Sequence, residues 1–327
     1  MKKTEVIIIG SGNMAVEYSK VLKKLKKKHT AICRSKESAV RFFENTGIIC
    51  DYNNGLEDYL VHKMSKNNKP KFAIVAVPVE DLFEIGLKLV NAGIKNILLE
   101  KPGALFQEQL VKLNEVAVEK QAKIYVAYNR RFFQSVRHLK KMAQDDGGIV
   151  SLYFDFTEWS DKIKPLKKGI CVKERWVLSN SSHVIDLAFF LAGKPKDMKC
   201  FHTGYIGWHS GFSKFSGAGV TDKDIIFSYR ADWDSSGRWG LMAYTKNFCF
   251  QLVPMENLHI VERNSVVKEE IILNSDIDLE FKPGLYHQIK AFISENDQDI
   301  CLLKDHIQNF KFYEQIAGYK EHNLHVV

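Results

Sequence analysis

The fold of this 327-residue chain is decided by the stretch Val6-Ile7-Ile8-Ile9-Gly10-Ser11-Gly12-Asn13-Met14-Ala15. Its first four residues are all apolar, as a strand covered on both faces requires. Its last two open a stretch with helical spacing of apolar side chains, and two glycines separate strand from helix. A buried strand that turns through glycines into a helix is typical of the first unit of a doubly wound parallel sheet.

The same alternation continues to residue 127. Nearly continuous apolar runs predict strands at residues 6–9, 30–33, 48–50, 72–77, 97–99 and 124–127. Helical patterns predict helices at residues 14–27, 37–45, 81–92 and 105–120. Gly93 stands where a left-handed C-cap would end the third of these helices. Strands alternating with helices predict a Rossmann domain over residues 1–128.

The pattern changes after a predicted helix at residues 134–143 and a loop at residues 145–148. Residues 151–159 and 224–233 alternate aromatic and polar side chains, which is typical of strands with one buried face. Further helices are expected at residues 182–191, before Gly193, and at residues 285–294. The sequence therefore predicts an α/β fold in which an N-terminal parallel Rossmann sheet precedes an α+β domain. That domain, over residues 129–327, would contain a large, mostly antiparallel open sheet.

The composition excludes several protein classes. With 45% hydrophobic and 26% charged residues the chain is unlike disordered, collagenous or repetitive sequences. No run approaches the roughly 20 apolar residues of a membrane span, and the apolar run near the N-terminus is too short for a signal peptide, so we expect a cytoplasmic protein. The 6 cysteines are dispersed, with no C-x-x-C pair. They predict reduced thiols and no metal site.

The glycine motif matches G-x-G-x-x-G/A in the strand, turn and helix context that gives it meaning. Gly10 would permit the tight turn, Gly12 would let the backbone approach a pyrophosphate, and Ala15 would allow close packing of helix on strand. The motif favours a dinucleotide at the helix N-terminus over a purely structural turn. The other residues of the predicted cofactor loop are Ser11, Asn13 and Met14.

The end of the second predicted strand bears on which dinucleotide binds. NAD-preferring domains carry Asp or Glu here, but this chain reads Ala31-Ile32-Cys33-Arg34-Ser35-Lys36. Arg34 and Lys36 offer positive charge, and Ser35 a hydroxyl, to a 2′-phosphate. Charge complementarity therefore favours NADP(H) over NAD(H). The alternative is that Arg34 stacks on adenine, which either cofactor allows.

Three further motifs accompany the glycine motif. They are Glu100-Lys101-Pro102-Gly103, Tyr128-Asn129-Arg130-Arg131-Phe132 and Ser181-Ser182-His183-Val184-Ile185-Asp186. Together the four motifs resemble the glucose-fructose oxidoreductase and inositol dehydrogenase family, often called Gfo/Idh/MocA. The resemblance implies a nicotinamide-dependent enzyme that acts on a sugar, a polyol or, as the preferred expectation, a nucleotide-linked sugar such as a UDP-amino sugar.

Lys101 and His183 are the candidate catalytic residues. Lys101 matches the lysine of the family's EKP motif, and it also stands at the C-terminal end of a parallel strand, where open α/β sheets bind ligands. Its ammonium could hydrogen-bond the reacting oxygen, or it could instead form an ion pair with Glu100. His183 matches the family's histidine. With an ordinary pKa of about 6.5, it could take the hydroxyl proton as hydride leaves carbon.

The chain departs from its relatives at Ser179, four residues before His183, where inositol dehydrogenase-like members have Asp. This departure weakens an assignment to inositol. Arg175 follows five lysines within residues 161–173, a basic stretch that suits a sugar diphosphate or is simply a solvated loop. The resemblance and the strand ends add Pro78, Glu100 and Lys101 to the expected cofactor contacts. The expected substrate contacts are Lys101, Asn129, Arg131, Arg175, Ser179, Asn180 and His183.

Two other functions stay open: a free-sugar or inositol-type polyol dehydrogenase, and a non-catalytic dinucleotide-binding regulator on the same fold. Lys101 and His183 argue against the regulator, because a sensor needs no proton relay. The formal charge is +8, but no helix-turn-helix or zinc finger is apparent, so no nucleic-acid partner is expected. No membrane partner is expected either. The open face of the second sheet predicts a homodimer or homotetramer.

Overall fold

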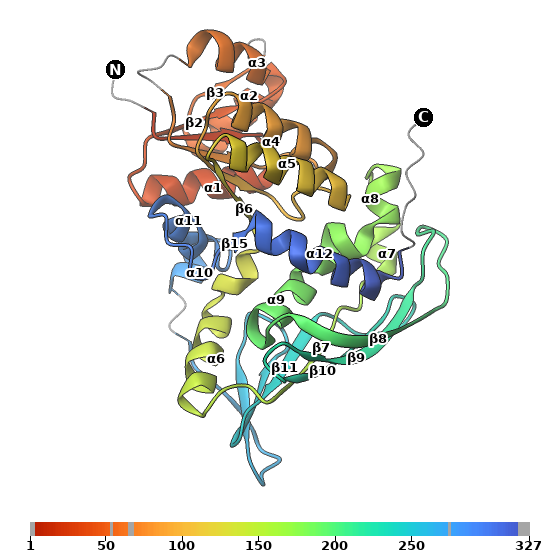
Figure 1. Cartoon of the computed structure of the whole chain (residues 1–327). Coiled ribbons are helices and arrows are strands. Elements are labelled where there is room, and N and C mark those ends of the chain that lie inside the picture. Colours follow the sequence, from red (N-terminus) through yellow and green to blue (C-terminus); the bar gives the residue numbers. More distant parts are fainter. Residues whose placement is uncertain (1–3, 53–54, 65–68, 274–275, 320–327) are drawn as a thin grey trace. The chain divides into compact units, whose positions relative to one another are not determined.

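The computed structural model describes residues 4–52, 55–64, 69–273 and 276–319 (Figure 1). The chain divides into two compact units. The first contains Met1–Phe133 and Ser275–Ile307, and the second contains Gln134–Asn274 and Gln308–Val327. The sequence analysis assigns all of residues 129–327 to the second domain, whereas the chain returns to the first unit at residues 275–307.

The first unit is built on a seven-stranded sheet with the strand order β15-β6-β5-β4-β1-β2-β3. Its strands are β1 (Val6–Ile9), β2 (His29–Ile32), β3 (Cys50–Asp51), β4 (Phe72–Val75), β5 (Asn96–Leu99), β6 (Lys123–Val126) and β15 (Cys301–Leu302). Strands β1 to β6 pair in parallel, and only β15 runs antiparallel, with Cys301 opposite Val126. The predicted parallel Rossmann sheet is confirmed.

Helices cover both faces of this sheet (Figure 1). One buried core joins α1 (Asn13–Lys24), α2 (Lys36–Thr46) and α11 (Leu285–Ile293) to the strands. On α4 (Leu82–Asn91), Gly86 approaches Leu99 of the sheet and Leu113 of α5 (Gln107–Glu119). Gly93, after α4, has a φ of +82°, which confirms the predicted left-handed C-cap. The short helices α3 (Gly55–Asp58) and α10 (Asp276–Glu280) complete the unit.

The returning segment is an integral part of the first core. Phe292 of α11 packs edge-on against Phe72 of β4, with ring centres 5.3 Å apart, and against Tyr125 of β6 at 5.6 Å. Such edge-to-face pairs add to the free energy gained by burying the rings. The division between the two units falls within the next helix, α12 (Leu303–Ala317), at Ile307.

The second unit contains an eight-stranded sheet with the strand order β14-β13-β12-β11-β7-β10-β9-β8. Its strands are β7 (Ser151–Asp155), β8 (Pro195–Thr203), β9 (Lys214–Thr221), β10 (Ile226–Asp232), β11 (Gly240–Tyr244), β12 (Phe248–Leu252), β13 (His259–Glu262) and β14 (Lys268–Glu270). Neighbouring strands are antiparallel except β7 and β10, which are parallel. The predicted large, mostly antiparallel sheet is confirmed.

Helix α9 (Ser182–Ala192) packs on one face of this sheet. Its Phe189 lies edge-on to Phe154 of β7 at 6.0 Å and to Phe227 of β10 at 5.3 Å. The other helices of the unit are α6 (Gln134–Asp145), α7 (Ser160–Ile163) and α8 (Ile170–Glu174). Within the described ranges, every helix is too short or too polar to cross a membrane.

Candidate functional site

The two motif glycines do different work at the N-terminus of α1. Gly10 has a φ of +115°, and a Cβ there would lie 2.2 Å from the carbonyl oxygen of Ala76, so the fold itself requires glycine. Gly12 is the N-cap of α1, with a φ of −76°, and a Cβ there would meet no atom within 4 Å. The fold therefore tolerates a side chain at Gly12, but that side chain would fill the space next to the helix N-terminus. The described residues thus fit a pyrophosphate approaching the backbone.

The rest of the loop lies along the same turn. Ser11 and Met14 are half-buried, and Asn13, the first residue of α1, is exposed. Met14 Sδ accepts a 3.1 Å hydrogen bond from the ammonium of Lys282 in the returning segment. Ala15 is fully buried beneath the turn, so the helix packs closely on the strand as its small side chain allows. These residues remain predicted cofactor contacts.

The residues after β2 are engaged by carboxylates. The exposed Arg34 forms an ion pair with Asp81, which ends the short 3-10 turn Val79–Asp81. Ser35 caps α2, because its Oγ accepts a 3.2 Å bond from the backbone N–H of Ser38. Backbone and Ser35 hydrogen bonds lower the pKa of Glu37, so a carboxylate lies in the first turn of α2 beside Lys36. Both Arg34 and Ser35 thus have acidic neighbours that a 2′-phosphate would have to displace or tolerate.

Pro78 lies three residues after the end of β4, which pairs with β1 on the side away from β2. It is exposed and forms the N-cap of the same 3-10 turn that carries Asp81. Pro78 follows Ala76 by two residues, and the carbonyl oxygen of Ala76 faces Gly10. Its predicted contact with the cofactor stays a prediction.

Glu100 and Lys101 follow directly after β5. Glu100 Oε1 accepts a 2.6 Å hydrogen bond from the hydroxyl of the buried Tyr18 on α1. Burial raises the pKa of Glu100, while the Tyr18 hydroxyl and the ammonium groups of Lys101 and Lys282 act to lower it. Burial and the adjacent Glu100 in turn raise the pKa of Tyr18 well above its ordinary value. Lys101 itself is half-buried, one residue beyond this pair.

The turn that carries Lys101 is also held from the other side. The buried His306 donates a 2.8 Å hydrogen bond from Nε2 to the carbonyl oxygen of Pro102, and the peptide bond between Lys101 and Pro102 is cis. Burial lowers the pKa of His306 to about 3, and Arg131 adds to this shift, so the imidazole is neutral. Sequence reasoning missed His306 because the pairing spans about two hundred residues and no local pattern signals it.

The motif after β6 forms a 3-10 turn, Asn129–Phe132, that is largely buried. Asn129 donates a 3.0 Å hydrogen bond from Nδ2 to the carbonyl of Pro283, and Gly284 packs against its backbone oxygen. The guanidinium of Arg131 lies over the ring of Tyr128 at 6.0 Å. Asn129 therefore fastens the returning segment to the first sheet, and its predicted substrate contact stays a prediction, as does that of Arg131.

In the second unit, His183 is the second residue of α9 and is half-buried, with its ring centre 6.1 Å from that of Trp239. Asp186, one turn further on, is buried and accepts a 3.3 Å hydrogen bond from the Tyr313 hydroxyl of α12. The helix start is preceded by a wide turn over Val177–Ser181. This turn holds both Ser179 and Asn180.

A buried carboxylate, Glu158, holds that turn through hydrogen bonds. Its side chain is only 1% exposed. Its Oε1 accepts hydrogen bonds from Asn180 Nδ2 at 2.8 Å and Ser181 Oγ at 2.7 Å. Its Oε2 lies 3.3 Å from Nη1 of Arg238. A buried carboxylate costs much free energy unless donors surround it, and here donors come from two loops.

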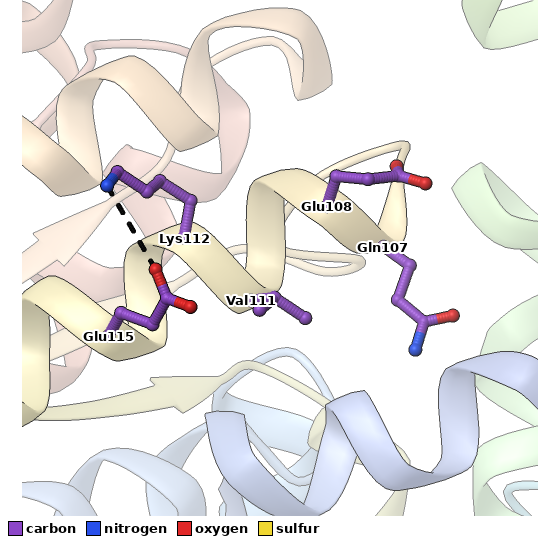
Figure 2. A pocket seen from close by; sticks show the side chains of 5 residues that line it. All are labelled: Gln107, Glu108, Val111, Lys112 and Glu115. Carbon is purple, nitrogen blue, oxygen red and sulfur yellow. Dashed lines mark ion pairs between the residues drawn. The ribbon is translucent and has the colours of Figure 1, made fainter. Parts of the chain in front are cut away.

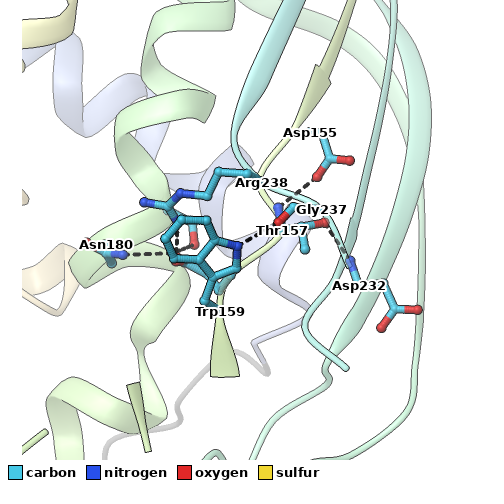
Figure 3. Close-up of polar contacts among 9 residues, drawn as sticks. Asp155, Thr157, Trp159, Asn180, Asp232, Gly237 and Arg238 are labelled. Carbon is cyan, nitrogen blue, oxygen red and sulfur yellow. Dashed lines mark hydrogen bonds and ion pairs between the residues drawn. The ribbon is translucent and has the colours of Figure 1, made fainter. Parts of the chain in front are cut away.

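Two indoles contact the guanidinium of Arg238. Its central carbon lies 4.6 Å from the ring centre of Trp159 and 4.4 Å from that of Trp239. Trp159 is fixed by a 2.9 Å hydrogen bond from its Nε1 to the carbonyl of Gly237, as Figure 3 shows. The Arg238 side chain is nevertheless 43% exposed. The loops after β7 and before β11 thus hold the cation of Arg238 between Trp159, Trp239 and Glu158, and we call this arrangement the braced cation.

The sequence analysis missed Glu158 and Arg238, although a signal for Glu158 exists. Residues 152, 154 and 156 are the buried apolar side chains of the alternating pattern around β7, and Glu158 has the same parity. A charged residue at an inward-facing position predicts a buried, partnered carboxylate. Arg238 carries no comparable local signal, because only the fold brings it to Glu158.

Two predicted substrate contacts have partners of their own in the second unit. Arg175 is buried, forms an ion pair with Glu314 of α12 and lies 4.7 Å from the ring centre of Tyr319. Ser179 is buried and donates a 3.1 Å hydrogen bond to the carbonyl of Val172. Both contacts stabilise the segment before α9, and a role in substrate binding remains a prediction for these residues.

The first unit also has an open surface depression along α5 (Figure 2). It is lined by Gln107, Glu108, Val111, Lys112 and Glu115, and its one ion pair, between Lys112 and Glu115, is 4.0 Å long. Four of its five side chains are ordinary polar residues of a solvated helix, so we assign it no role. Among the residues that the structure describes, no group of three or more His, Cys, Asp or Glu could hold a metal ion.

The comparisons with known proteins agree with this geometry. Residues 4–128 match the family model described as "Oxidoreductase family, NAD-binding Rossmann fold", Gfo/Idh/MocA. No curated protein matches the chain. Solved structures match nearly all of it at low identity, so that they show the fold alone.

Three of these structures illustrate the range. UDP-N-acetylglucosamine 3-dehydrogenase from Acidithiobacillus ferrooxidans has a TM-score of 0.74 and 14% identity, covering 97% of each chain. Levoglucosan dehydrogenase in complex with NADH and L-sorbose has a TM-score of 0.76 and 16% identity, covering 97% of this chain and 96% of the other. The WlbA dehydrogenase from Chromobacterium violaceum, in complex with NADH and UDP-GlcNAcA, has a TM-score of 0.70 and 12% identity, covering 97% and 93%.

The family match covers β1 through β6, which are the strands whose ends carry the glycine turn and the Glu100-Lys101 pair. Residues 4–128 thus match the Gfo/Idh/MocA oxidoreductase family, with its NAD-binding Rossmann fold.

Proposed function

We propose that this chain oxidises a secondary hydroxyl of a sugar, or reduces the corresponding ketone, with NAD(P) as the hydride carrier. One observation carries the proposal: Lys101 stands at the carboxyl end of β5 on a turn fixed by Tyr18 through Glu100 and by His306 through Pro102. A lysine on a turn fixed in this way, at a strand end of a Rossmann sheet, is suited to orient a reacting oxygen.

In the oxidative direction the reaction removes a hydride from carbon and a proton from oxygen. Bound NAD(P) supplies the hydride acceptor. Lys101 would donate a hydrogen bond to the alcohol oxygen and hold it in place as the carbonyl forms. His183 would accept the hydroxyl proton, which a neutral imidazole can do near neutral pH. Reduction of the ketone would use the same groups with the proton moving in the opposite direction.

We propose a nucleotide-linked sugar as the substrate. Two structural neighbours, the UDP-N-acetylglucosamine 3-dehydrogenase and the WlbA dehydrogenase with UDP-GlcNAcA, handle such molecules by their descriptions. The five lysines within residues 161–173 add positive charge that would suit a diphosphate. Free sugars and polyols are the competing substrates, and levoglucosan dehydrogenase is a neighbour of that kind.

For the cofactor we propose NADP(H) ahead of NAD(H), on the positive charge of Arg34 and Lys36. Asp81 and Glu37 oppose this choice, because they already neutralise part of that charge. The preference between the two cofactors depends on whether Arg34 leaves its ion pair with Asp81 to bind the 2′-phosphate. We also keep the expectation of a cytoplasmic enzyme as part of the proposal.

We further propose that the outward face of the second sheet forms a homodimer or homotetramer interface. Tyr153 of β7 lies opposite Met242 of β11, which lies opposite Gln251 of β12. All three side chains are half-buried on the face away from α9, whereas their neighbours Phe154, Leu241 and Phe250 are buried. A row of neutral and apolar side chains on an exposed sheet is suited to pair with a second copy.

The test is reduction of NAD⁺ and NADP⁺ by the purified chain with a panel of nucleotide sugars, free sugars and inositols. Substrate-dependent reduction that Lys101→Met lowers at least a hundredfold in kcat would support the proposal. His183→Asn should also lower kcat. Dinucleotide binding by both variants shows that the cofactor fold is intact. Tight dinucleotide binding without turnover of any panel member would instead favour a regulator.

A further inference from the structure

The guanidinium of Arg238 is fixed in direction before any ligand arrives. Trp159 and Trp239 contact it through their ring faces, and Nη1, at one edge of the guanidinium, forms an ion pair with Glu158 Oε2. The N–H groups of a guanidinium lie in its plane, so contacts with aromatic faces leave the other in-plane donors available for hydrogen bonds. The Arg238 side chain as a whole is 43% exposed, so a ligand can reach it from solvent.

Glu158 only partly neutralises this cation. Its Oε1 already accepts bonds from Asn180 and Ser181. The 3.3 Å separation between Oε2 and Nη1 is longer than the roughly 2.7–2.9 Å of a strong charge-assisted bond. The contact is a single one, whereas a carboxylate that neutralises Arg well engages two N–H groups. Arg238 therefore keeps the capacity to bind a second, external oxyanion.

The surroundings add to the positive potential. The segment that begins at Trp159 and runs to residue 176 contains five lysines but only Asp161 and Glu174 as acids. Its Arg175 is already paired with Glu314 and does not add to this excess. Contact with two indoles also removes water from the guanidinium, which lowers the cost of exchanging water for an anion. These features favour an anionic ligand over a neutral one.

The braced cation lies close to the proposed proton acceptor. The ring of Trp239, which contacts Arg238, is 6.1 Å from the ring of His183. Asn180 and Ser181, which hold Glu158, immediately precede α9. A ligand bound to Arg238 would therefore reach the start of α9 with a sugar-sized group.

We propose that Arg238 binds an oxyanion substituent of the substrate, a carboxylate or a phosphate, and that the enzyme accordingly takes acidic sugars. The exposed indole of Trp159 lies beside it and would contact the sugar ring. That the bound acidic sugar is the substrate rests on the function proposed above. That Arg238 binds an acidic sugar does not depend on that function, so the two claims can fail separately.

Binding is measured on the full chain by the change in indole fluorescence on titration. The probes are glucuronate and glucose 6-phosphate, with glucose as their neutral counterpart. UDP-GlcNAcA and UDP-GlcNAc follow as a pair that shares the anionic diphosphate and differs only in the sugar carboxylate. We expect an acidic probe to bind at least tenfold more tightly than its neutral counterpart. The carboxylate and phosphate arms distinguish the two sources of oxyanion. Equal affinity for acidic and neutral probes, or no binding of the acidic ones, overturns the proposal.

Arg238→Gln should lower the affinity for the acidic probe at least tenfold and leave that for the neutral probe unchanged. The matched control is Arg230→Gln, because Arg230 is 47% exposed in the same unit and also lies near a carboxylate, Asp155, at 3.6 Å. The double variant Glu158→Gln with Arg238→Gln leaves no buried carboxylate without its cation. Its affinity for the acidic probe should fall by the same factor as in Arg238→Gln alone. Unchanged acidic binding in a folded variant overturns the proposal.

Turnover separates this inference from the function. If the wild type reduces NAD(P)⁺ with neutral sugars and Arg238→Gln does not change KM, the inference fails and the function stands. If acidic sugars bind through Arg238 but none is oxidised, the function fails and the inference stands. When both hold, KM for the acidic substrate should rise at least tenfold in Arg238→Gln, with kcat changed far less.

Discussion

Tyr18 on α1 donates its hydroxyl to Glu100 Oε1 across 2.6 Å, which ties the first helix to the turn that carries Lys101. Both partners have pKa values raised by burial. The pair is therefore a neutral phenol bonded to a carboxylate that the fold holds in a poorly solvated place. Its contribution to stability must depend on pH.

Replacing Tyr18 by Phe should destabilise the fold by about 1–3 kcal/mol, because a buried carboxylate loses its donor. The pKa of Glu100 is raised in the folded state, so the folded chain binds more protons than the unfolded one. This group's contribution is then most favourable at low pH and declines as pH rises. Tyr18→Phe raises that pKa further, so denaturant unfolding should show a larger loss at pH 8 than at pH 5. Tyr205→Phe, at a side chain 74% exposed, is the control. An equal loss at both pH values would contradict this account.

His306 should make the fold sensitive to mild acid. Its pKa is about 3 in the folded chain and about 6.5 in the unfolded chain. Below pH 6.5 the unfolded chain therefore binds a proton at this histidine, whereas the folded chain does not. Stability is therefore lost as pH falls, by about 2 kcal/mol between pH 7 and pH 5 from this residue alone. The measurement is unfolding of the wild type and His306→Gln across that interval. His306→Gln should show a shallower decline, and identical slopes would rule the histidine out as the cause.

The two motif glycines should respond in opposite ways to a side chain. Gly12→Val should leave the unfolding free energy within about 1 kcal/mol, since its φ suits any residue and its Cβ meets open space, but it should weaken dinucleotide binding at least a hundredfold. Gly10→Ala should lower stability, because its Cβ would lie 2.2 Å from the oxygen of Ala76 and its φ is +115°. Thermal unfolding and cofactor titration measure the two effects. A Gly12→Val protein that binds dinucleotide normally would remove the pyrophosphate from this loop.

The ion pair between Arg34 and Asp81 predicts how cofactor preference can be moved. Asp81→Asn frees the guanidinium and should raise the affinity for NADP⁺ relative to NAD⁺ by about three- to tenfold, or about 0.7–1.4 kcal/mol. Arg34→Gln should lower that ratio by a similar factor. The Lys88–Glu57 pair is a matched control, because Lys88→Gln removes an exposed ion pair elsewhere in the same unit. A ratio unaffected by either change at Arg34 or Asp81 would place the 2′-position elsewhere.

Met242→Glu should dissociate any assembly formed by the outward face of the second sheet. The charge would lie between Tyr153 and Gln251, and burying it against a second copy would cost several kcal/mol. Light scattering of wild type and variant gives the molecular mass directly. Lys196→Glu, at an exposed residue of the edge strand β8, serves as the comparison, since it places a Glu outside the row and changes the net charge by two units instead of one. A wild type that is monomeric at working concentration refutes the interface.

The sequence predicted elements best where one strand or helix is specified by its own residues. Val6–Ile9 has the predicted bounds, because four consecutive β-branched residues followed by glycine are typical of a strand that is covered on both faces. The third strand was expected at residues 48–50 but pairs only as Cys50–Asp51, since its extent is set by Ala31 and Ile32 on its neighbour. Strand ends depend on partners, and partners are not local.

What the sequence could not show are contacts between distant segments. The returning segment with α11, the hydrogen bond from His306 to Pro102, and the meeting of Glu158 with Arg238 each join residues at least eighty positions apart. Helix α12 escaped prediction because its first turns belong to one unit and the rest to the other. Its buried positions Leu303, His306, Phe310, Tyr313 and Ala317 do follow helical spacing, but the buried His306 interrupts the apolar pattern in the sequence.

The returning segment also sets an order of events during synthesis. The first sheet obtains its edge strand β15 and the covering helix α11 only when residue 307 has left the ribosome, long after β1 to β6 have emerged. Until then the edge of β6 has unpaired backbone groups, and Phe72 and Tyr125 lack the aromatic ring that later covers them. A nascent chain arrested before residue 275 would thus present an open strand edge and an apolar face, which are the features that chaperones bind and that promote aggregation.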